Sequence, residues 1–380
     1  MADAYIVGTA RTPVGTRKGG LAAVHPSDLA AHVLGHLIDR VGVDPAAVDD
    51  VIMGCVDQLG GQSGNIGRSG WLSAGLPESV PAVTIDRQCG SSQQSLHFAA
   101  QAVMSGTQDL VVAAGVENMA MVPMSANAKV LEDLGHGRHG AGWDERYGEH
   151  EISQLRGAQL IAEKWGLSRP DLERYSLESH RRAAHAITSG YFTEQIAPLA
   201  GVEHDEGVRR DSTMESMAAL KPVREGWDIT AAVSSQISVG AAALLVASEQ
   251  AVRTHGLTPL ARVHTMAVVG DDPVYMLTGP IPATQAVLKR SGLSISDIDT
   301  FEVNEAFASV VLAWAKESGA SLDRTNVNGG AIAHGHPLGA TGAILAMKLI
   351  HELHRTGGRY GLQTMCEGGG QANATIIERV

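Results

Sequence analysis

The sequence predicts an α/β protein with two comparable halves and a long segment between them. Its 380 residues are more than one simple core usually holds. Short apolar runs alternate with longer amphipathic segments in the first and the last third of the chain. Residues 119–238 break this alternation and are rich in Met, His, Arg and Glu.

The first third of the chain alternates strand patterns with helix patterns. Buried strands are expected at four apolar runs: Ala4–Gly8, Val51–Cys55, Val83–Ile85 and Leu110–Ala114. Helices are expected at Pro26–Val41 and Ser91–Met104. Alternation of this kind predicts a mostly parallel sheet that helices cover on both faces.

The last third repeats the pattern. Strands are expected at Leu260–Val269, Thr300–Val303, Tyr360–Cys366 and Ala372–Arg379. Helices are expected at Pro282–Ser291, Ala306–Ser318 and Gly342–Arg355, the last of them after a glycine-rich loop. Two comparable halves indicate an internally duplicated fold.

The middle segment, residues 119–238, is interpreted as a substrate-facing loop domain, because a long insertion between regular halves usually carries function. Helices are expected in it near Glu151–Trp165 and Arg169–Ser189. A surface decoration or an oligomer contact is the alternative. The predicted division is 1–118 plus 239–258 for the N-terminal half, 119–238 for the loop domain and 259–380 for the C-terminal half.

Composition excludes several classes of protein. The formal net charge of −12 argues against a nucleic-acid partner, but a local basic patch can still bind a phosphorylated small molecule. The three cysteines, Cys55, Cys89 and Cys366, form no CxxC pair and indicate a reducing compartment. No apolar run reaches the roughly 18 residues of a membrane span, so a cytoplasmic protein without a membrane partner is expected.

The segment Asp86–Ser92 carries the first candidate group, Cys89. It follows a strand pattern and precedes a helix pattern, which places the thiol at a helix N-terminus, where free N–H groups and the macrodipole favour a thiolate. The small residues after Cys89 let a substrate carbonyl approach the backbone. A buried structural cysteine is the alternative.

The glycine-rich loop Asn328–Gly342 presents two imidazoles, His334 and His336. His336 precedes Pro337, which restricts its backbone to a non-helical conformation. A rigid loop that presents an imidazole suits a general base or an oxyanion donor. A surface or core role remains the alternative for His334.

Two further strand ends carry reactive side chains. Cys366 leads into the three glycines 368–370, and its thiol is suited to proton transfer. The segment Glu302–Phe307 passes from a strand into a helix and offers the Asn304 amide and the Glu305 carboxylate where α/β sites usually lie.

Together these segments resemble the thiolase family. DRQCGSS, NEAF, GGAIAHGHPLGATG and CEGGG begin at residues 86, 304, 329 and 366, and the resemblance runs from Arg11-Thr-Pro to the C-terminus. It is strongest to bacterial degradative members, especially actinobacterial ones of steroid and fatty-acid breakdown. The resemblance implies the thiolase fold, with duplicated mixed five-stranded sheets in α-β-α-β-α layers and an inserted loop domain.

The resemblance also implies catalytic roles. Cys89 is expected to be acylated, His336 to activate it, and Cys366 to move the proton at the substrate α-carbon. One oxyanion hole is expected from His336 and a water held by Asn304. A second is expected from the backbone N–H groups of Cys89 and Gly368. These are the roles of an acyl-CoA:acetyl-CoA C-acyltransferase that cleaves a 3-oxoacyl-CoA.

Four residues are expected near the substrate and CoA by the same resemblance: Ser235, Met276, Ala306 and Phe307. Coenzyme A is then a cosubstrate, and neither a permanently bound cofactor nor a metal is expected. Family members are dimers or tetramers, so a homodimer or homotetramer is predicted.

This sequence departs from the family pattern at several places. Ser153-Gln154 stands where acetoacetyl-CoA-specific relatives carry His-Met, which favours a bulkier acyl group. Val239 replaces a usual Asp, and His334 replaces a common aliphatic residue; neither change has an evident meaning in the sequence. The basic residues Arg209, Arg210 and Lys221 are candidates for the CoA phosphates, or for a solvated loop face.

Other readings of the residues remain open. A biosynthetic acetoacetyl-CoA thiolase would run the reaction as a condensation, and a non-catalytic relative would bind CoA or lipid without turnover. A decarboxylating ketoacyl synthase is disfavoured because it would carry His or Asn in place of Cys366. A metal protein is disfavoured because no paired ligand motif is present.

Overall fold

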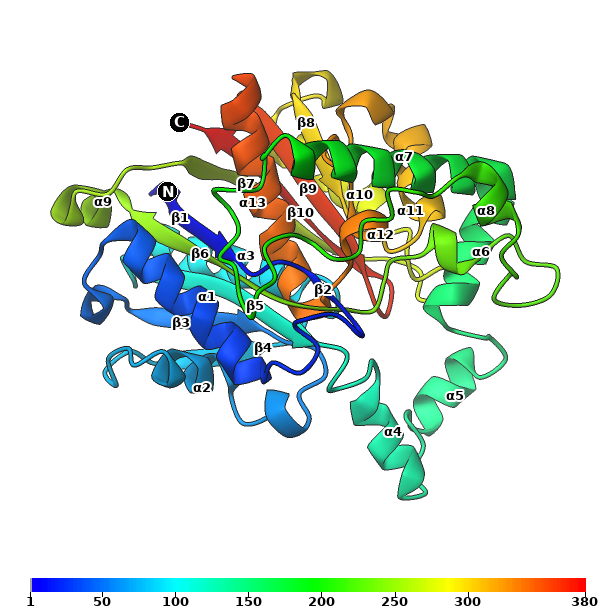
Figure 1. The fold of residues 1–380 in the computed structure, drawn as a ribbon, viewed down its shortest axis with the longest axis horizontal. Helices are drawn as coiled ribbons and strands as arrows, with labels where there is room; N and C mark the ends of the chain where they lie inside the picture. Colours follow the sequence, from blue (N-terminus) through cyan, green and yellow to red (C-terminus); the bar gives the residue numbers. More distant parts are fainter. Residues whose placement is uncertain (1) are drawn as a thin grey trace.

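In the computed structural model, which describes residues 2–380, two halves of the chain build one continuous sheet (Figure 1). The N-terminal half supplies β1 (Ala4–Arg11), β2 (Gly15–Thr16), β3 (Asp50–Gly54), β4 (Ala82–Ile85), β5 (Leu110–Asn118) and β6 (Ser238–Ser248). The C-terminal half supplies β7 (Ala261–Gly270), β8 (Thr300–Val303), β9 (Tyr360–Glu367) and β10 (Gln371–Arg379).

The two halves repeat one strand order. The first runs β4-β3-β5-β6-β1, with two parallel ladders followed by two antiparallel ones, and β2 adds to β6. The second runs β8-β9-β10-β7, and Thr325 forms a single parallel bridge to Phe301 of β8 where the first half has β4. The predicted duplication is therefore present, with the fifth strand of the second half reduced to one bridge. A short antiparallel pairing of β1 with β7 joins the halves.

The expectation of a mostly parallel sheet is wrong, and the mixed sheets implied by the family resemblance are correct. Of the strand ladders among residues 2–380, only β3-β4, β3-β5 and β8-β9 are parallel. A tight turn of three glycines joins β9 to β10 and leaves no room for the crossover that a parallel pair requires. Strand β6 was not among the expected strands, although its apolar run is buried at every position like that of β5.

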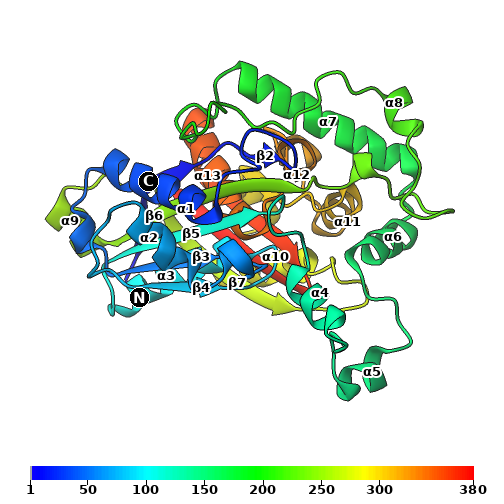
Figure 2. The same ribbon diagram turned by 60° about the horizontal axis from the view of Figure 1, so that its bottom comes forward.

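Helices make three layers around the two half-sheets (Figures 1 and 2). Helices α1 (Pro26–Val41) and α2 (Ile66–Ser73) cover the outer face of the first half-sheet. Helices α10 (Pro280–Ser291) and α11 (Ala308–Ser318) cover the outer face of the second. Helices α3 (Ser91–Ser105) and α13 (Leu338–Thr356) lie between the half-sheets in one shared apolar cluster. The result is the expected α-β-α-β-α layering.

Local signals account for the helix ends. Helix α1 begins with Pro26 in its first turn and ends at Gly42, whose φ of 70° is left-handed and suits glycine. Helix α13 begins at Leu338, four residues before the expected start, because Pro337 occupies its N-cap. Helix α11 begins at Ala308, so Ala306 and Phe307 lie in the connection that precedes it. A short helix, α9 (Glu249–His255), follows β6.

The middle segment consists of helices and loops. It holds α4 (Ala126–Asp133), α5 (Ala141–Tyr147), α6 (Gln154–Trp165), α7 (Arg169–Thr188) and α8 (Met214–Ala218). Helices α6 and α7 match the two expected ones and pack on α11, whereas α4 and α5 extend away from the body as an arm (Figure 2). Among residues 2–380, no helix has the length and apolarity to cross a membrane.

Candidate active site

Cys89 lies where the chain enters α3. Gln88 before it has a φ of 49°, a strained left-handed conformation, and Gly90 after it is the N-cap. The expected position at a helix N-terminus is confirmed. The expected thiolate is not supported in the resting protein, because burial and then the nearby Glu367 carboxyl raise the pKa of Cys89 to about 12. Cys89 therefore needs a base to become a nucleophile.

His336 lies on the loop between α12 (Ala331–His334) and α13, with its side chain buried. Its Nδ1 lies 2.6 Å from Thr341 Oγ1, and that hydroxyl already donates to the Pro337 carbonyl at 2.8 Å. Thr341 therefore accepts from Nδ1–H. The His336 Nε2 lies 3.3 Å from the Asn304 amide nitrogen, which can only donate.

These contacts define one tautomer of His336, with the proton on Nδ1 and a lone pair on Nε2. Burial lowers the pKa of His336 to about 4, so the ring is neutral at pH 7. The backbone N–H of His336 donates to Ser238 Oγ at 3.0 Å and fixes the loop against β6. A neutral imidazole with a defined lone pair is the arrangement of a general base.

Asn304 follows β8 and is fully buried. Its backbone N–H donates to the Thr364 carbonyl of β9 at 3.0 Å, which continues the parallel pairing by one residue. Its side-chain nitrogen faces His336, and its Oδ1 accepts no hydrogen bond from residues 2–380. Asn304 thus supplies a rigidly held donor beside the imidazole.

Cys366 is the second-last residue of β9 and is fully buried. Burial, and next the charge of Cys89, raise the pKa of its thiol well above the usual value. Gly368 follows in the turn, where an added Cβ would lie 2.8 Å from the side-chain oxygen of Gln88. The final turn therefore packs against the residue that precedes Cys89.

Glu117, near the end of β5, links the loops that carry the site. Its carboxylate accepts the N–H groups of Val56, Asp57 and Gly339, at 2.9, 3.2 and 2.9 Å, and the Gln62 amide at 2.8 Å. Burial raises the pKa of Glu117 to about 7, and these donors oppose that rise. Because Gly339 follows the His336 loop, one carboxylate ties the two halves together beside the site.

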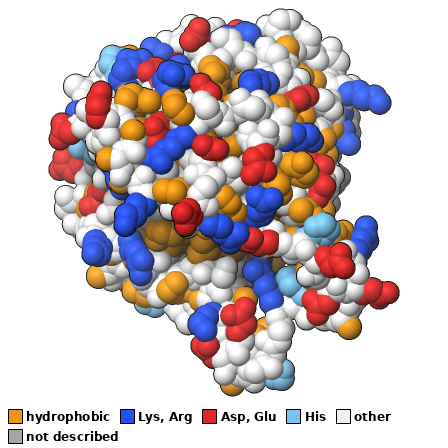
Figure 3. Space-filling view, turned by 90° about the vertical axis from the view of Figure 1, so that its right-hand side faces the viewer, with side chains coloured by type: hydrophobic (Ala, Val, Ile, Leu, Met, Phe, Trp, Pro, Cys, Tyr) orange, Lys and Arg blue, Asp and Glu red, His pale blue; other side chains and the backbone are white. Residues whose placement is uncertain are grey.

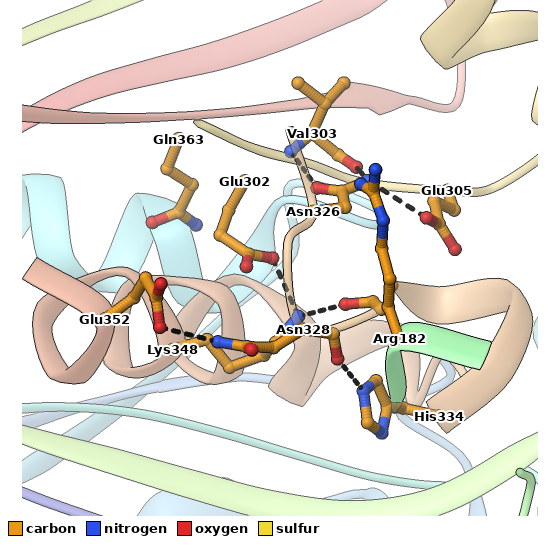
Figure 4. Close-up of polar contacts among 12 residues, drawn as sticks. Arg182, Glu302, Val303, Glu305, Asn326, Asn328, His334, Lys348, Glu352 and Gln363 are labelled. Atoms are coloured by element: carbon orange, nitrogen blue, oxygen red, sulfur yellow. Dashed lines mark hydrogen bonds and ion pairs between the residues drawn. The ribbon is translucent and has the colours of Figure 1, made fainter. Parts of the chain in front are cut away.

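A buried polar network surrounds the end of β8, where Glu302, Val303 and Glu305 lie (Figure 4). Glu305 accepts from Tyr175, Ser179, Asn326 and the N–H of Ile332. Deeper, Lys348 pairs with Glu302 at 2.9 Å, and Asn328 donates to Glu352 at 2.8 Å. These contacts hold the β8 end and the glycine-rich loop in one geometry.

His334 takes part in a buried ion cluster. Its Nε2 lies 2.8 Å from the Asn328 carbonyl and its Nδ1 lies 2.8 Å from Asp205, which also binds Arg11 at 2.7 and 3.1 Å. Burial opposes the charge, but Arg11 and His334 hold the pKa of the Asp205 carboxyl well below its usual value. Asp205 belongs to the middle segment, so this cluster fastens that segment to both halves.

The residues expected near the acyl group and CoA come together. The N–H of Ser235 donates to the Ala306 carbonyl at 2.9 Å, and Ser234 pairs with Phe307. Met276, with a φ of 58°, packs against the same buried cluster as Ala306, Phe307 and Cys366. The structure therefore joins this expected group to the second thiol.

The candidate phosphate contacts are exposed. The N–H of Arg209 donates to His180 at 3.1 Å, Arg210 donates to Thr188 at 3.0 Å, and Lys221 is exposed. No signal in the sequence marked Trp227, whose ring centroid lies 4.4 Å from the guanidinium group of Arg224 and 5.7 Å from that of Arg156. Figure 3 shows a hollow with apolar side chains and a border of Lys and Arg on this side of the molecule.

Two cavities beside the middle segment are lined by neither Cys89 nor Cys366. The cavity of about 390 Å³ between α7 and α11 is lined by residues such as Tyr175 and Leu312. A smaller one of about 190 Å³, lined in part by His180, Arg209 and Gln236, lies under the middle segment. Among residues 2–380, no group of three or more His, Cys, Asp or Glu side chains could hold a metal ion.

Comparison with known proteins identifies the family. Residues 4–250 match the family model described as "Thiolase, N-terminal domain", and residues 257–379 match "Thiolase, C-terminal domain". The steroid 3-ketoacyl-CoA thiolase FadA6 of Mycobacterium tuberculosis is 57% identical over 387 residues, covering 100% of this chain and 95% of that protein. The 3-oxoadipyl-CoA/3-oxo-5,6-dehydrosuberyl-CoA thiolase of Escherichia coli is 42% identical over the full length of both chains.

Solved structures agree. Human mitochondrial 3-ketoacyl-CoA thiolase in complex with CoA superposes with a TM-score of 0.91 at 34% identity, covering 100% of this chain and 98% of that one. The fold, both family models and the full-length relatives lead to one assignment. The chain belongs to the thiolase family and is an acyltransferase.

Proposed function

We propose that this enzyme cleaves a 3-oxoacyl-CoA with CoA, through an acyl group carried on Cys89. The observation that carries the proposal is the His336 tautomer, whose Nε2 lone pair lies among the site residues next to Asn304. A neutral base, a thiol that needs one, and a second thiol that can carry a proton are the parts that thiolysis requires.

In the first half-reaction His336 Nε2 takes the Cys89 proton, and the sulfur attacks the 3-oxo carbon. The bond between C2 and C3 breaks, and its electron pair stays on C2 as an acetyl-CoA enolate. The Cys366 thiol gives its proton to C2, which releases acetyl-CoA. The protonated His336 and the Asn304 amide are donors for the enolate oxygen, where negative charge develops.

In the second half-reaction the CoA thiol attacks the acyl group on Cys89. Its proton passes to the Cys366 thiolate, and Cys89 leaves as a thiolate that regains its proton from His336. The backbone N–H groups of Cys89 and Gly368 are the donors for the tetrahedral oxyanion. Two thiols are needed because one sulfur cannot hold the acyl group and move the carbon proton in the same step.

The substrate is a degradative intermediate from a fatty acid or a steroid. The 57%-identical relative is named a steroid 3-ketoacyl-CoA thiolase, and Ser153-Gln154 replaces the pair typical of acetoacetyl-CoA-specific members. Biosynthetic condensation of acetyl-CoA is the second candidate. A non-catalytic CoA carrier is the least supported, because Cys89, His336 and Cys366 are all present.

Coenzyme A is a cosubstrate that enters through the basic-bordered hollow of the middle segment (Figure 3). Ser235, Met276, Ala306 and Phe307 line its path to the thiols. The division into 1–118 plus 239–258, 119–238 and 259–380 also belongs to this proposal. The homodimeric or homotetrameric state and the cytoplasmic location are also part of this proposal.

The test is a thiolysis assay of Cys89→Ala with CoA and 3-oxoacyl-CoAs from acetoacetyl to long-chain and steroid-derived. Activity is expected to vanish, because no sulfur remains to carry the acyl group. Cys55→Ala is the matched control. The Cys55 thiol is fully buried and donates to the Glu117 carboxylate at 3.9 Å. Wild-type turnover by Cys89→Ala would refute the proposal, and the best substrate of the wild type separates the degradative from the biosynthetic reading.

A further inference from the structure

One buried acid next to the site has no part in the reaction above. Glu367 ends β9, directly after Cys366, and is fully buried. Neither of its carboxyl oxygens has a hydrogen bond of ordinary distance and angle among residues 2–380, although the backbone N–H of Asn373 lies close enough to lower its pKa. A buried polar group without a partner is costly, so a retained one calls for an explanation.

Glu367 fills the space that Gly90 leaves open. A Cβ added to Gly90 would lie 1.9 Å from Glu367 Oε1 and 2.6 Å from its Cδ, so any other residue at 90 would force the Glu367 side chain to move. Side chains alternate along a strand, so Cys366 and Glu367 point to opposite faces of β9. Cys366 packs with Ala306 and Phe307, whereas Glu367 reaches the backbone that carries Cys89.

The charged and titratable groups around Glu367 come from two elements. The loop before α3 presents Asp86, Arg87 and Cys89, and β9 itself presents Cys366. Strand β10 presents the uncharged Asn373. The Arg87 guanidinium donates to Gln371 Oε1 at 2.6 Å and makes no ion pair with Glu367. The acid therefore has no partner of opposite charge in contact.

Burial raises the pKa of Glu367 to about 8, although Arg87 and the N–H of Asn373 lower it. Its charge in turn raises the pKa of Cys89, together with Asp86 and Glu117. Electrostatic coupling between two ionisable groups is reciprocal, so the ionisation of Cys89 and that of Glu367 oppose each other.

We propose that Glu367 is a positioning residue that gates the reactivity of Cys89: as the neutral acid it supports the nucleophile's loop, and as the carboxylate it suppresses the thiolate. The inference rests on the proposed role of Cys89 as nucleophile. Above the pH at which Glu367 ionises, the reactivity of Cys89 then levels off, whereas that of an ordinary cysteine keeps rising until its own pKa. The residue that follows Cys366 on β9 then controls the ionisation of Cys89.

The experiment measures the alkylation rate of Cys89 by iodoacetamide, followed by peptide mapping, from about pH 6.5 to about pH 9.5. A single ionising thiol far below its pKa gains about tenfold in rate per pH unit. In the wild type the gain is expected to flatten above about pH 8, where Glu367 ionises. In Glu367→Gln it is expected to continue, so the variant reacts about tenfold faster than wild type at the alkaline end and equally at the acid end.

Glu367→Leu gives the same readout with a neutral apolar side chain and guards against an amide-specific effect. The exposed Glu249→Gln is the control and is expected to follow the wild type at every pH. The proposal is overturned if wild-type Cys89 shows no flattening, a result that needs no variant to fold, or if the neutral variants match the wild type throughout. Alkylation does not depend on turnover, so failure of thiolysis and failure of this inference are distinguishable.

Discussion

The two halves of the molecule share one topology but place different chemistry at equivalent positions. Cys89 precedes α3 in the first half, and His336 precedes α13 in the second. Cys55 follows β3, and Asn304 follows β8. Glu117 lies near the end of β5, and Cys366 lies near the end of β9. The duplicated frame therefore creates three pairs of matched positions, and in the proposed mechanism the nucleophile and the base come from different halves.

The comparison shows that equivalent helix ends and strand ends can carry different functions in the two halves. The first half supplies one reactive sulfur and uses its other two positions for packing and for fastening loops. In the proposed mechanism the second half supplies the base, the donor and the proton carrier. Each difference can be tested by a pair of substitutions at matched positions.

His336→Ala carries the largest expected effect among the second-half positions. Removal of the base leaves Cys89 with a pKa near 12 and no acceptor for its proton. Thiolysis is expected to fall by about 10³- to 10⁴-fold in kcat/KM, with thermal stability nearly unchanged. Single-turnover acylation by a 3-oxoacyl-CoA would place the loss in the first half-reaction; rapid acylation would break the assignment of the base.

Asn304→Ala is expected to cost about 10²- to 10³-fold in kcat, because one donor for the enolate oxygen is lost. Its matched partner is Cys55→Ala, for which less than about threefold is expected. Steady-state kinetics on one substrate compare the two directly. Equal losses at both positions would mean that the halves contribute alike, against the division described above.

Glu117→Gln should affect stability more than chemistry. The variant places an amide where four donors converge, so unfolding in urea is expected to require about 2–4 kcal/mol less than in the wild type. Glu249→Gln, at an exposed ion pair, is expected to stay within about 0.5 kcal/mol. A neutral effect of Glu117→Gln would show that the loops of the two halves are held by other contacts.

The pH dependence on the acid side is expected to be small. The pKa of His336 falls from 6.5 in the unfolded chain to about 4 in the folded one, so the free base persists well below neutrality. kcat/KM should change less than about threefold between about pH 7 and about pH 5.5, where an ordinary histidine would lose about tenfold. Between those pKa values the unfolded chain binds the extra proton, so stability declines as pH falls, and unfolding must be followed in parallel.

Much of the fold could be predicted from sequence, where the local signal was strong. Helix α1 and strand β8 have the expected bounds, because proline, glycine and clear apolar runs mark them. The chemical groups Cys89, His336 and Cys366 stand out by residue type and by their glycine neighbours. The parallel sheet was predicted wrongly, because alternation of elements does not report the direction of strands that hairpins or long insertions connect.

Other parts of the site depend on contacts between distant segments and leave no local trace. Asp205 meets Arg11 and His334 only after three regions have packed together. Glu117 looks like an ordinary strand end until Gly339 approaches it. In the sequence, Glu367 stands between Cys366 and three glycines and carries no local signal of a role. Its contact with Gly90 is evident only in the structure.

Strand β6 has a consequence for how the chain is made. It is the link between β5 and β1, and β1 pairs with no other strand of its own half. During synthesis, the residues before 238 emerge while the position of β6 between β5 and β1 is still unoccupied. The first half can close only after the whole middle segment and β6 have left the ribosome, so the nascent chain carries a large unfinished apolar surface for most of its translation.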